Sequence, residues 1–408
     1  MSKEYELILV KISGEDKPGL ATTLTSILAR YGATILDIGQ ADIHSTISLG
    51  ILFKSPKSKS GDIIKDIRFE THQMGVQSRF SPVSVEDYLQ WVSNQGKHRW
   101  IVTLLGRKFS AHAISETTAI LTSQGLNIDS ISRLTGRLPL VEDGSDNKAC
   151  IQLSVRGTPI DKTKIQSEFL RISKELGFDI SFQEDNLYRR NRRLICLDMD
   201  STLIQTECID ELAERAGTGA QVRAITESAM RGEIDFCESF TRRVALLKGL
   251  PVSVMEEIAE SLPITEGAER LLTILKRHGF KIAILSGGFT FFGNYLKRRF
   301  GVDYVYANDL EVGDDGCLTG RYVGDIVDGR RKAELLRTIA QVENIDLQQV
   351  IAVGDGANDL PMLNIAGLGI AYHAKPKVQA GAKQSISNMG LDGILYMLGF
   401  KDKYISQL

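Results

Sequence analysis

Short, continuous apolar segments dominate the chain after residue 193, and each ends in small or polar residues. The segments are "LICLD", "KIAILSGG", "DYVYAND", "VIAVGDG" and "LGIAY". Apolar runs of this length, without strict alternation, are typical of parallel strands that are buried on both faces of a sheet. Amphipathic stretches between them predict the connecting helices. We therefore expect residues 190–408 to form an α/β domain with a doubly wound parallel sheet.

The first 185 residues contain one pattern twice. A strand, "ELILVKISG", precedes a helical stretch, "GLATTLTSILARYG", and the pattern returns about 93 residues later as "WIVTLLG" and "AHAISETTAILTSQG". The glycines that end the two predicted helices, Gly32 and Gly125, align. Each copy continues with two strands, a helix and a last strand. The order βαββαβ predicts two ferredoxin-like domains, at residues 1–90 and 97–185.

Length and composition agree with a protein of two or three globular domains. The chain has 408 residues, with 49 Lys and Arg against 51 Asp and Glu. This balance offers no basic face, so we expect no nucleic acid and no anionic membrane as a partner. The five cysteines have no CxxC spacing and are expected to be reduced thiols. No signal-peptide pattern or apolar run of about 20 residues is present, so a cytoplasmic protein is expected.

A basic segment, "NLYRRNRR" at residues 186–193, lies between the second repeat and the α/β domain. Runs of like charge are more often solvated linkers than binding sites. We expect this segment to be a solvated connector.

Two carboxylates, Asp198 and Asp200, directly follow the apolar run "LICL". Ligands of open parallel sheets bind beyond the carboxyl ends of the strands, and residues i and i+2 of an extended chain point to the same side. Two carboxylates so close repel each other, and a divalent cation relieves the repulsion. The pattern therefore indicates a metal site at the end of this strand.

A second apolar strand, in "VIAVGDGANDLPML", runs into Asp355, Asn358 and Asp359. Hard oxygen ligands without histidine or thiolate favour Mg²⁺ over zinc. An EF-hand loop is excluded, because position twelve counted from Asp355 is Ala366 and not glutamate.

Two further segments suit a phosphate group. Ser286 and Gly287 follow a third strand and can offer a hydroxyl and a backbone N–H to phosphate oxygens. Lys332 begins a helical stretch and can neutralise phosphate or the carboxylates. Each signal is weak alone. Their shared position after successive strands supports a common site.

These motifs, "DMDST", "SGG", Lys332 and "GDGAND", resemble in order and spacing the four motifs of the haloacid dehalogenase-like phosphatases, whose fold is Rossmann-like. Within that superfamily the chain resembles the phosphoserine phosphatase family. That likeness includes Glu207 of "QTECIDELA", and Phe236 and Arg243 of "FCESFTRRVALLKGLP". Residues from about 207 to 270 are similar to the family's helical cap.

The resemblance implies magnesium-dependent hydrolysis of O-phospho-L-serine to L-serine and phosphate, the last step of serine biosynthesis. Asp198 would be the nucleophile that forms an aspartyl-phosphate, and Asp200 the general acid and base. Mg²⁺ would be held by Asp198, Asp355 and the main-chain carbonyl of Asp200. The resemblance further implies the residues that bind or cover the substrate: Ser286, Gly287, Lys332, Asn358 and Asp359 around the phosphate, Glu207 on the ammonium, Arg243 on the carboxylate and Phe236 over the pocket.

The two repeats resemble ACT domains, which commonly bind amino acids and regulate a neighbouring enzyme. "DKPGL" in the first copy is similar to the family's ligand loop, which implies Asp16, Pro18 and Gly19 as residues for an amino-acid effector. The second copy has "GRKFSAH" instead. Pro18 and Gly19 can also be explained as a turn and helix start. The resemblance also implies a homodimer.

Three alternatives remain open at this point. The chain could act on another small phosphomonoester, as a phosphatase or a phosphotransferase, with Glu207 and Arg243 as ordinary charged residues of cap helices. A glycosyltransferase also uses a DxD motif, but it leaves "GDGAND", Lys332 and "SGG" unexplained. A regulatory binding protein with a decayed enzyme domain is disfavoured by the intact set of carboxylates.

Overall fold

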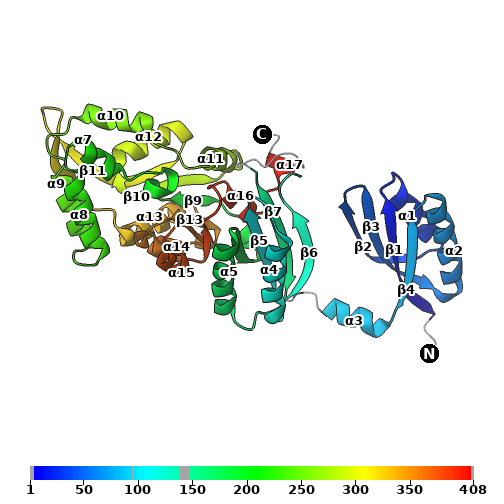
Figure 1. Ribbon diagram of the computed structural model, residues 1–408. Helices are drawn as coiled ribbons and strands as arrows, with labels where there is room; N and C mark the ends of the chain where they lie inside the picture. Colours follow the sequence, from blue (N-terminus) through cyan, green and yellow to red (C-terminus); the bar gives the residue numbers. More distant parts are fainter. Residues whose placement is uncertain (1–3, 94–95, 97, 138–146, 406–408) are drawn as a thin grey trace. The chain divides into compact units, whose positions relative to one another are not determined.

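A computed structural model describes residues 4–93, 96, 98–137 and 147–405, and the chain divides into two compact units, residues 1–97 and 98–408 (Figure 1). The elements of the first unit are β1 (Tyr5–Glu15), α1 (Leu20–Arg30), β2 (Thr34–Ile43), β3 (Thr46–Pro56), α2 (Lys57–Gln73), β4 (Gln77–Val83) and α3 (Val85–Ser93).

The first unit is an antiparallel sheet with the strand order β2-β3-β1-β4. Alternate residues of β1, namely Ile8, Val10 and Ile12, are buried in a core with Leu24 and Leu28 of α1. This period of two on the strand and helical spacing on α1 follow from the geometry of the two elements. The unit has the ferredoxin-like order that the sequence predicted.

The second unit begins with the other copy of this fold (Figure 1). Its elements are β5 (Arg99–Gly106), α4 (Ala111–Ser123), β6 (Asn127–Arg133), β7 (Ala149–Arg156), α5 (Lys162–Leu176) and β8 (Asp179–Glu184). The strand order, β6-β7-β5-β8, is the order of the first sheet with each strand replaced by its counterpart. The predicted duplication is confirmed.

The rest of the second unit is an α/β domain around a sheet of order β12-β11-β10-β9-β13-β14-β15. The strands are β9 (Leu194–Leu197), β10 (Lys281–Phe289), β11 (Tyr304–Val312), β12 (Leu318–Val323), β13 (Val350–Gly354), β14 (Leu368–Tyr372) and β15 (Gln384–Ile386). All neighbouring pairs are parallel except β11 and β12, which form an antiparallel pair at one edge that the sequence did not reveal.

Helices cover the sheet, and a further group of helices is inserted between β9 and β10. The inserted helices are α7 (Cys208–Arg215), α8 (Gly219–Met230), α9 (Phe236–Ala245) and α10 (Val252–Ser261). The remaining helices are α6 (Leu187–Arg190), α11 (Ala268–Arg277), α12 (Thr290–Phe300), α13 (Gly329–Val342), α14 (Leu360–Ile365), α15 (Pro376–Gly381), α16 (Gly393–Met397) and α17 (Asp402–Ile405), with short helical turns at Met199–Leu203, Leu347–Gln349 and Ala357–Asp359.

The central strand β9 explains why the sequence shows an unbroken apolar run. Leu194 and Cys196 lie in the core on one face of the sheet, and Ile195 and Leu197 lie in the core on the other face. All four side chains are fully buried. A strand covered on both faces cannot carry polar residues at alternate positions, so the run predicted the layered structure correctly.

The expectation of a solvated connector at residues 186–193 is wrong for two of its arginines. Arg189 and Arg192 are buried, with 5% and 8% of their surfaces exposed. Arg192 donates to the backbone carbonyl of Gln348 at 2.6 Å, and Arg189 reaches that of Met397 at 3.4 Å. Charge alone misled the prediction, because long cationic side chains can satisfy orphan carbonyls at the ends of buried elements.

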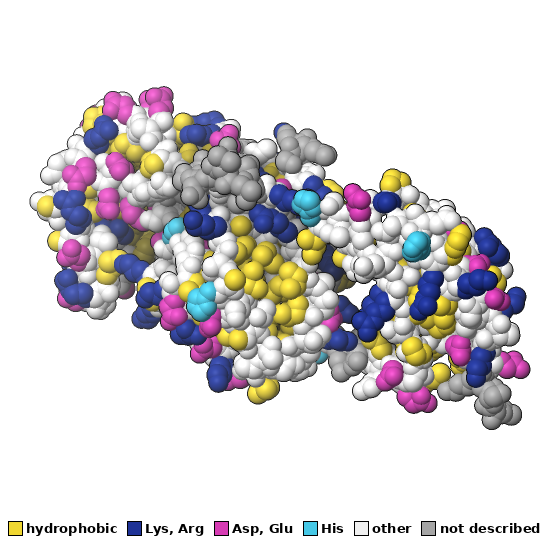
Figure 2. Space-filling model, turned by 45° about the vertical axis from the view of Figure 1, so that its right-hand side comes forward, with side chains coloured by type: hydrophobic (Ala, Val, Ile, Leu, Met, Phe, Trp, Pro, Cys, Tyr) yellow, Lys and Arg dark blue, Asp and Glu magenta, His cyan; other side chains and the backbone are white. Residues whose placement is uncertain are grey.

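The structure also describes the distribution of charged side chains, the state of the cysteines and the apolar character of the helices. Figure 2 shows basic and acidic side chains intermixed over most of the visible face. The five cysteines are free thiols, of which Cys150, Cys196 and Cys208 are buried. Among the helices of the described ranges, none combines the length and the apolar character needed to cross a lipid bilayer.

Candidate active site

The carboxyl ends of β9 and β13 place two acidic residues at one edge of the sheet. Asp198 follows β9 and Asp355 follows β13. The two strands are parallel neighbours with Leu197 opposite Val353, and the N–H of Asp198 donates to the carbonyl of Val353 at 2.9 Å. Strand pairing therefore sets the separation of the two side chains.

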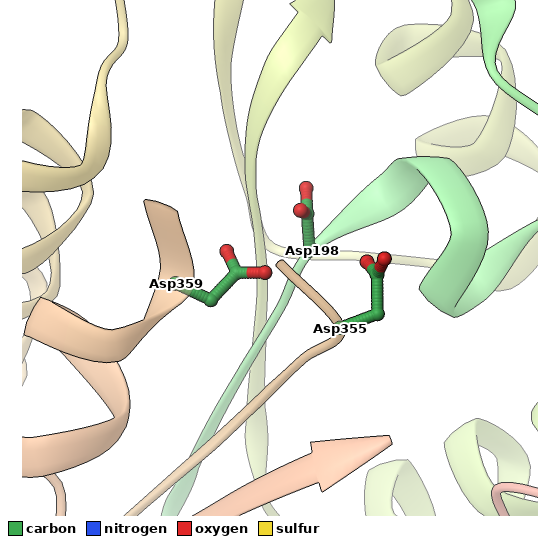
Figure 3. A group of neighbouring side chains, drawn as sticks. All are labelled: Asp198, Asp355 and Asp359. Atoms are coloured by element: carbon green, nitrogen blue, oxygen red, sulfur yellow. The ribbon is translucent and has the colours of Figure 1, made fainter. Parts of the chain in front are cut away.

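Three carboxylates converge at this edge. Asp198, Asp355 and Asp359 each offer an oxygen atom, and these atoms lie within 4.8 Å of one another (Figure 3). Asp359 comes from the helical turn after β13, where its Oδ2 accepts the N–H of Gly356 at 2.9 Å. The sequence placed Asp359 beside the phosphate, and the structure brings it into the carboxylate group as well.

Lys332 is the cation within this group. Its side chain is fully buried, and its Nζ lies 2.7 Å from Asp198 Oδ2 and 2.7 Å from Asp359 Oδ1. Burial would lower the pKa of this amine, but the charges of Asp198 and Asp359 outweigh burial and hold the pKa above its ordinary value. The lysine is therefore a fixed positive charge.

One lysine does not neutralise three carboxylates. Burial and the nearby Asp198 charge raise the pKa of Asp355 to about 7 and that of Asp359 to about 7. A raised pKa of this size means that too few positive charges lie near these carboxylates to stabilise their ionised forms. The group therefore fits a hard divalent cation with oxygen ligands, such as Mg²⁺.

Asp200 lies in a different environment from Asp198. Burial and the charge of Glu207 raise the pKa of Asp200 to about 8. Its Oδ1 accepts the N–H of Cys208 at 3.2 Å. The turn that carries it includes Ser201 at φ 55°, a left-handed conformation that a serine adopts at some cost in energy. A carboxyl group that keeps its proton near neutral pH is suited to act as a general acid.

The loop at the end of β10 approaches Asp200 closely. Ser286 is fully buried, and its Oγ accepts the N–H of Gly288 at 2.9 Å. A Cβ atom at Gly288 would lie 2.3 Å from Asp200 Oδ2, so a side chain there would displace the Asp200 carboxyl. Asn308 fixes the loop from β11, donating to the carbonyls of Gly287 and Gly288 at 2.8 and 3.2 Å.

Residues of the inserted helices face the same edge. The hydroxyl of Ser201 donates to Glu207 Oε1 at 2.7 Å, and Glu207 immediately precedes α7. The Glu207 side chain stays accessible, yet the surrounding protein excludes enough water to raise the pKa of its carboxyl, and the charge of Asp198 adds to this. Arg243 of α9 is half-buried, which lowers its pKa, while the Glu207 charge opposes the shift. An acidic and a basic side chain thus interact electrostatically near Asp200.

Phe236 joins the inserted helices to the sheet domain. Its ring stacks at 6.3 Å on that of Phe240, and a Cβ atom at Gly287 would lie 3.0 Å from Phe236 Cζ. The ring of Phe236 therefore lies over the Ser286–Gly288 loop. Asn358, in the turn with Asp359, is half-buried, and its carbonyl is approached closely by Gly329 at the start of α13.

Two further residues of this site, Thr202 and Asn308, were not predicted from the sequence. Thr202 is fully buried and donates to Asp355 Oδ1 at 3.2 Å, although "DMDST" had already been singled out. Asn308 ends the apolar part of "DYVYAND", so the rule that polar residues after strands form the site would have found it. The predicted effector residues Asp16, Pro18 and Gly19 lie between β1 and α1 of the first unit.

Comparison with known proteins agrees with this geometry. Residues 192–367 match the haloacid dehalogenase-like hydrolase family, and residues 6–81 match the ACT domain family. A solved haloacid dehalogenase family hydrolase from Salmonella enterica superposes with a TM-score of 0.63 at 31% identity, covering 73% of this chain and 98% of that one. The fold and site define a haloacid dehalogenase-like hydrolase with amino-terminal ACT domains.

Two relatives that match nearly the whole chain identify the family within this class of hydrolases. The chain is 38% identical to phosphoserine phosphatase SerB2 of Mycobacterium tuberculosis, over 96% of this chain and 93% of the relative. It is 37% identical to a phosphoserine phosphatase of Streptomyces coelicolor, over 98% and 93% of the two chains. The chain belongs to the phosphoserine phosphatase family, and it is a phosphatase.

The close approach at Gly288 gives a first prediction. We expect Gly288→Ala to displace the Asp200 carboxyl and to lower kcat by about 100-fold or more, since small displacements of catalytic groups have effects of this size. Steady-state phosphatase assays, with thermal unfolding to verify the fold, measure this. The control is Gly61→Ala on α2, where an added Cβ meets nothing within 4 Å. Equal activity of both variants would contradict the assigned approach.

Proposed function

We propose that this protein hydrolyses O-phospho-L-serine to L-serine and phosphate, the last step of serine biosynthesis. The observation that carries the substrate assignment is the opposite-charge pair Glu207 and Arg243 beside Asp198 and Asp200. An amino-acid phosphomonoester has an ammonium group for the first, a carboxylate for the second and a phosphate for the aspartates. The names of the full-length relatives support the same substrate.

The proposed first step uses Asp198 and Asp200. A carboxylate oxygen of Asp198 attacks phosphorus while the bond from phosphorus to the serine oxygen breaks, which gives an aspartyl-phosphate and serine. Asp200, whose pKa of about 8 keeps it protonated near neutral pH, gives its proton to the departing oxygen. The N–H of Met199, which donates to Asp198 Oδ1 at 2.7 Å, and Lys332 on Oδ2 fix the orientation of the nucleophile.

The second step regenerates the enzyme. Asp200, now a carboxylate, takes a proton from water as the water attacks phosphorus and the bond to Asp198 breaks. Mg²⁺ held by Asp198, Asp355 and the main-chain carbonyl of Asp200 would offset the charge on the phosphoryl group. Ser286, Gly287 and Lys332 orient that group, and Asn358 and Asp359 support them. Phe236 covers the pocket and limits access of water.

Substrate choice provides the direct test. We expect magnesium-dependent phosphate release from O-phospho-L-serine to exceed that from other small phosphomonoesters, and Asp198→Asn to abolish it because the amide is a poor nucleophile. Arg243→Leu should raise KM for phosphoserine by at least about thirtyfold, since it removes a charge-assisted contact in a partly dehydrated site. Phosphate release assays over a substrate panel measure both.

A neighbouring arginine supplies the matched control. Arg242 is exposed and paired with Glu238 on the same helix, so Arg242→Leu should leave KM for phosphoserine unchanged. A strong preference for an ester that lacks a carboxylate would be consistent with the proposed mechanism, but it would contradict the substrate-binding roles assigned to Glu207 and Arg243. Absence of phosphate release from phosphoserine would remove the proposed function.

Metal binding should depend on pH. Asp355, with a pKa raised to about 7, must lose its proton before it binds a cation. The dissociation constant for Mg²⁺ should therefore fall by about tenfold between pH 6 and pH 8, as one proton is displaced. Titration calorimetry in two buffers of different ionisation enthalpy counts the protons released. An affinity that stays constant over this range would contradict the assigned ligands.

We also propose that the first ACT domain binds a free amino acid at the loop of Asp16, Pro18 and Gly19. Gly19, the N-cap residue of α1, has φ 91°, a left-handed conformation that favours glycine, and no side chain caps the helix there. Calorimetry with the full chain should detect serine or another amino acid, and Gly19→Val should weaken binding by about tenfold through steric and backbone strain. Gly32→Val, at a left-handed glycine at the other end of α1, is the control. Identical binding by both variants would place the effector elsewhere.

A further inference from the structure

The loop from Gly106 to Ser110 connects β5 to α4 in the second ACT domain. Its position corresponds to that of the Asp16–Leu20 loop in the first ACT domain, because the two sheets have equivalent strand orders. The second loop has no Pro-Gly pair and carries Arg107 instead. The contacts of Arg107 show that this loop has a different use.

The inserted helices form a cap that joins the sheet domain through two chain segments. The chain enters the cap after Leu203 and leaves it before Ala268. The two segments pair at a bridge between Ile204 and Ile264, where the N–H of Gln205 donates to the carbonyl of Pro263 at 2.8 Å. The N–H of Thr265 donates to the carbonyl of Leu203 at 3.1 Å. We call this two-stranded connection, residues 203–206 and 262–267, the cap hinge.

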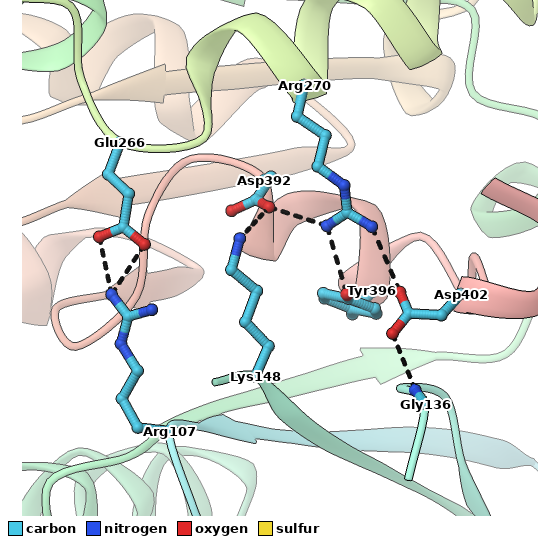
Figure 4. A network of polar contacts seen from close by, with 8 residues as sticks. All are labelled: Arg107, Gly136, Lys148, Glu266, Arg270, Asp392, Tyr396 and Asp402. Atoms are coloured by element: carbon cyan, nitrogen blue, oxygen red, sulfur yellow. Dashed lines mark hydrogen bonds and ion pairs between the residues drawn. The ribbon is translucent and has the colours of Figure 1, made fainter. Parts of the chain in front are cut away.

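Arg107 binds the base of the cap hinge (Figure 4). Its Nη2 donates to both carboxylate oxygens of Glu266, at 2.8 and 2.7 Å. The main chain of Glu266 is held from the other side, because its carbonyl accepts the N–H of Leu391 at 2.8 Å. A Cβ atom at Gly390 would lie 2.6 Å from that carbonyl, so the two segments are in close contact. Glu266 is thus fixed between the second ACT domain and the loop before α16.

A second cation of the same ACT domain, Lys148, contacts Asp392, the residue after the Leu391 that holds Glu266. It forms an ion pair with Asp392, whose fully buried carboxylate also accepts from Arg270 of α11 at 2.8 Å. A Cβ atom at Gly267 would lie 2.3 Å from Asp392 Oδ1. Arg107 thus binds Glu266 directly, and Lys148 binds Asp392, which lies against Gly267 where the hinge ends and α11 begins (Figure 4).

The second ACT domain is firmly docked on the sheet domain, so its loop can act as a fixed support. The amide of Gln384 in β15 bonds both the N–H and the carbonyl of Phe182 in β8, at 2.9 and 2.8 Å. Asp179 accepts the N–H groups of Ser387 and Asn388 at 2.8 and 3.0 Å. Leu105 and Cys150 of the ACT sheet belong to the main core of the sheet domain. Polar and apolar contacts together hold the two domains in one unit.

We infer that the second ACT domain clamps the base of the cap hinge through two positioning residues. Arg107 of the β5–α4 loop binds Glu266 of the hinge, and Lys148, directly before β7, binds Asp392 beside Gly267. The clamp fixes the base about which the cap moves, and so favours the arrangement in which Phe236 lies over the Ser286–Gly288 loop. This inference concerns the cap of the proposed phosphatase, but the clamp itself is defined by contacts that do not involve substrate.

Amide hydrogen exchange of the full chain tests the clamp without any substrate. We expect Arg107→Leu and Glu266→Leu each to speed exchange at Gln205 and Thr265 by about two- to fivefold, the effect of losing an accessible but bidentate ion pair. The charge-reversed pair Arg107→Glu with Glu266→Arg should restore the slow exchange. KM of the phosphatase reaction should rise by a similar factor in the single variants, with a smaller change in kcat.

Arg171→Leu is the matched control. Arg171 lies on α5 of the same ACT domain, and its ion pairs with Glu168 and Glu175 stay within that helix. The inference is overturned if hinge exchange is unchanged in Arg107→Leu, if it changes equally in Arg171→Leu, or if charge reversal gives no recovery. Because exchange is measured without substrate, a failure of the phosphoserine assignment would leave this result interpretable.

Discussion

The buried ion pairs of Lys332 are the interaction on which the rest of the site depends. Asp198 and Asp359 lie at the ends of different elements, and their repulsion in a water-poor site would separate them without a cation between them. The position of Lys332 is set by α13, whose apolar face is buried against β9 and β13. Asp328 caps this helix by accepting the N–H of Arg331 at 2.7 Å. A buried charge is thus held in place by ordinary helix packing and capping.

The two aspartates of "DMDST" have distinct environments although only one residue separates them. Asp198 contacts Lys332 through Oδ2 and accepts the N–H of Met199 through Oδ1. Asp200 receives no lysine and lies near Glu207, which favours its protonated form. The turn at Ser201 directs the chain away from the sheet, so that the second carboxyl meets the start of α7 and the first stays with the strand. Backbone geometry therefore separates the proposed nucleophile, Asp198, from the proposed general acid, Asp200.

The two ACT domains share one fold, but the second one also binds the sheet domain. Both copies have the same strand order and equivalent buried faces. A small set of polar residues in the second copy, among them Asp179, Arg107 and Lys148, binds the sheet domain instead of remaining at a free surface. These polar residues lie outside the hydrophobic core of the second ACT domain. The core and the interface are therefore formed by different residues.

The sequence by itself determined the elements and most of the site. Hydrophobic periodicity identified the repeated βαββαβ domains and the buried strands, and acidic residues after β9 and β13 marked the edge of the sheet where the candidate site lies, because these signals are local in the chain. Tertiary structure decided what depends on neighbours distant in sequence: the burial of Arg189 and Arg192, the antiparallel strand β12, and the contacts of Thr202 and Asn308. It also decided the pairing of Arg107 with Glu266, 159 residues further along the chain. A single sequence holds no signal for such a pair, since either residue reads as an ordinary surface charge until the two domains are docked.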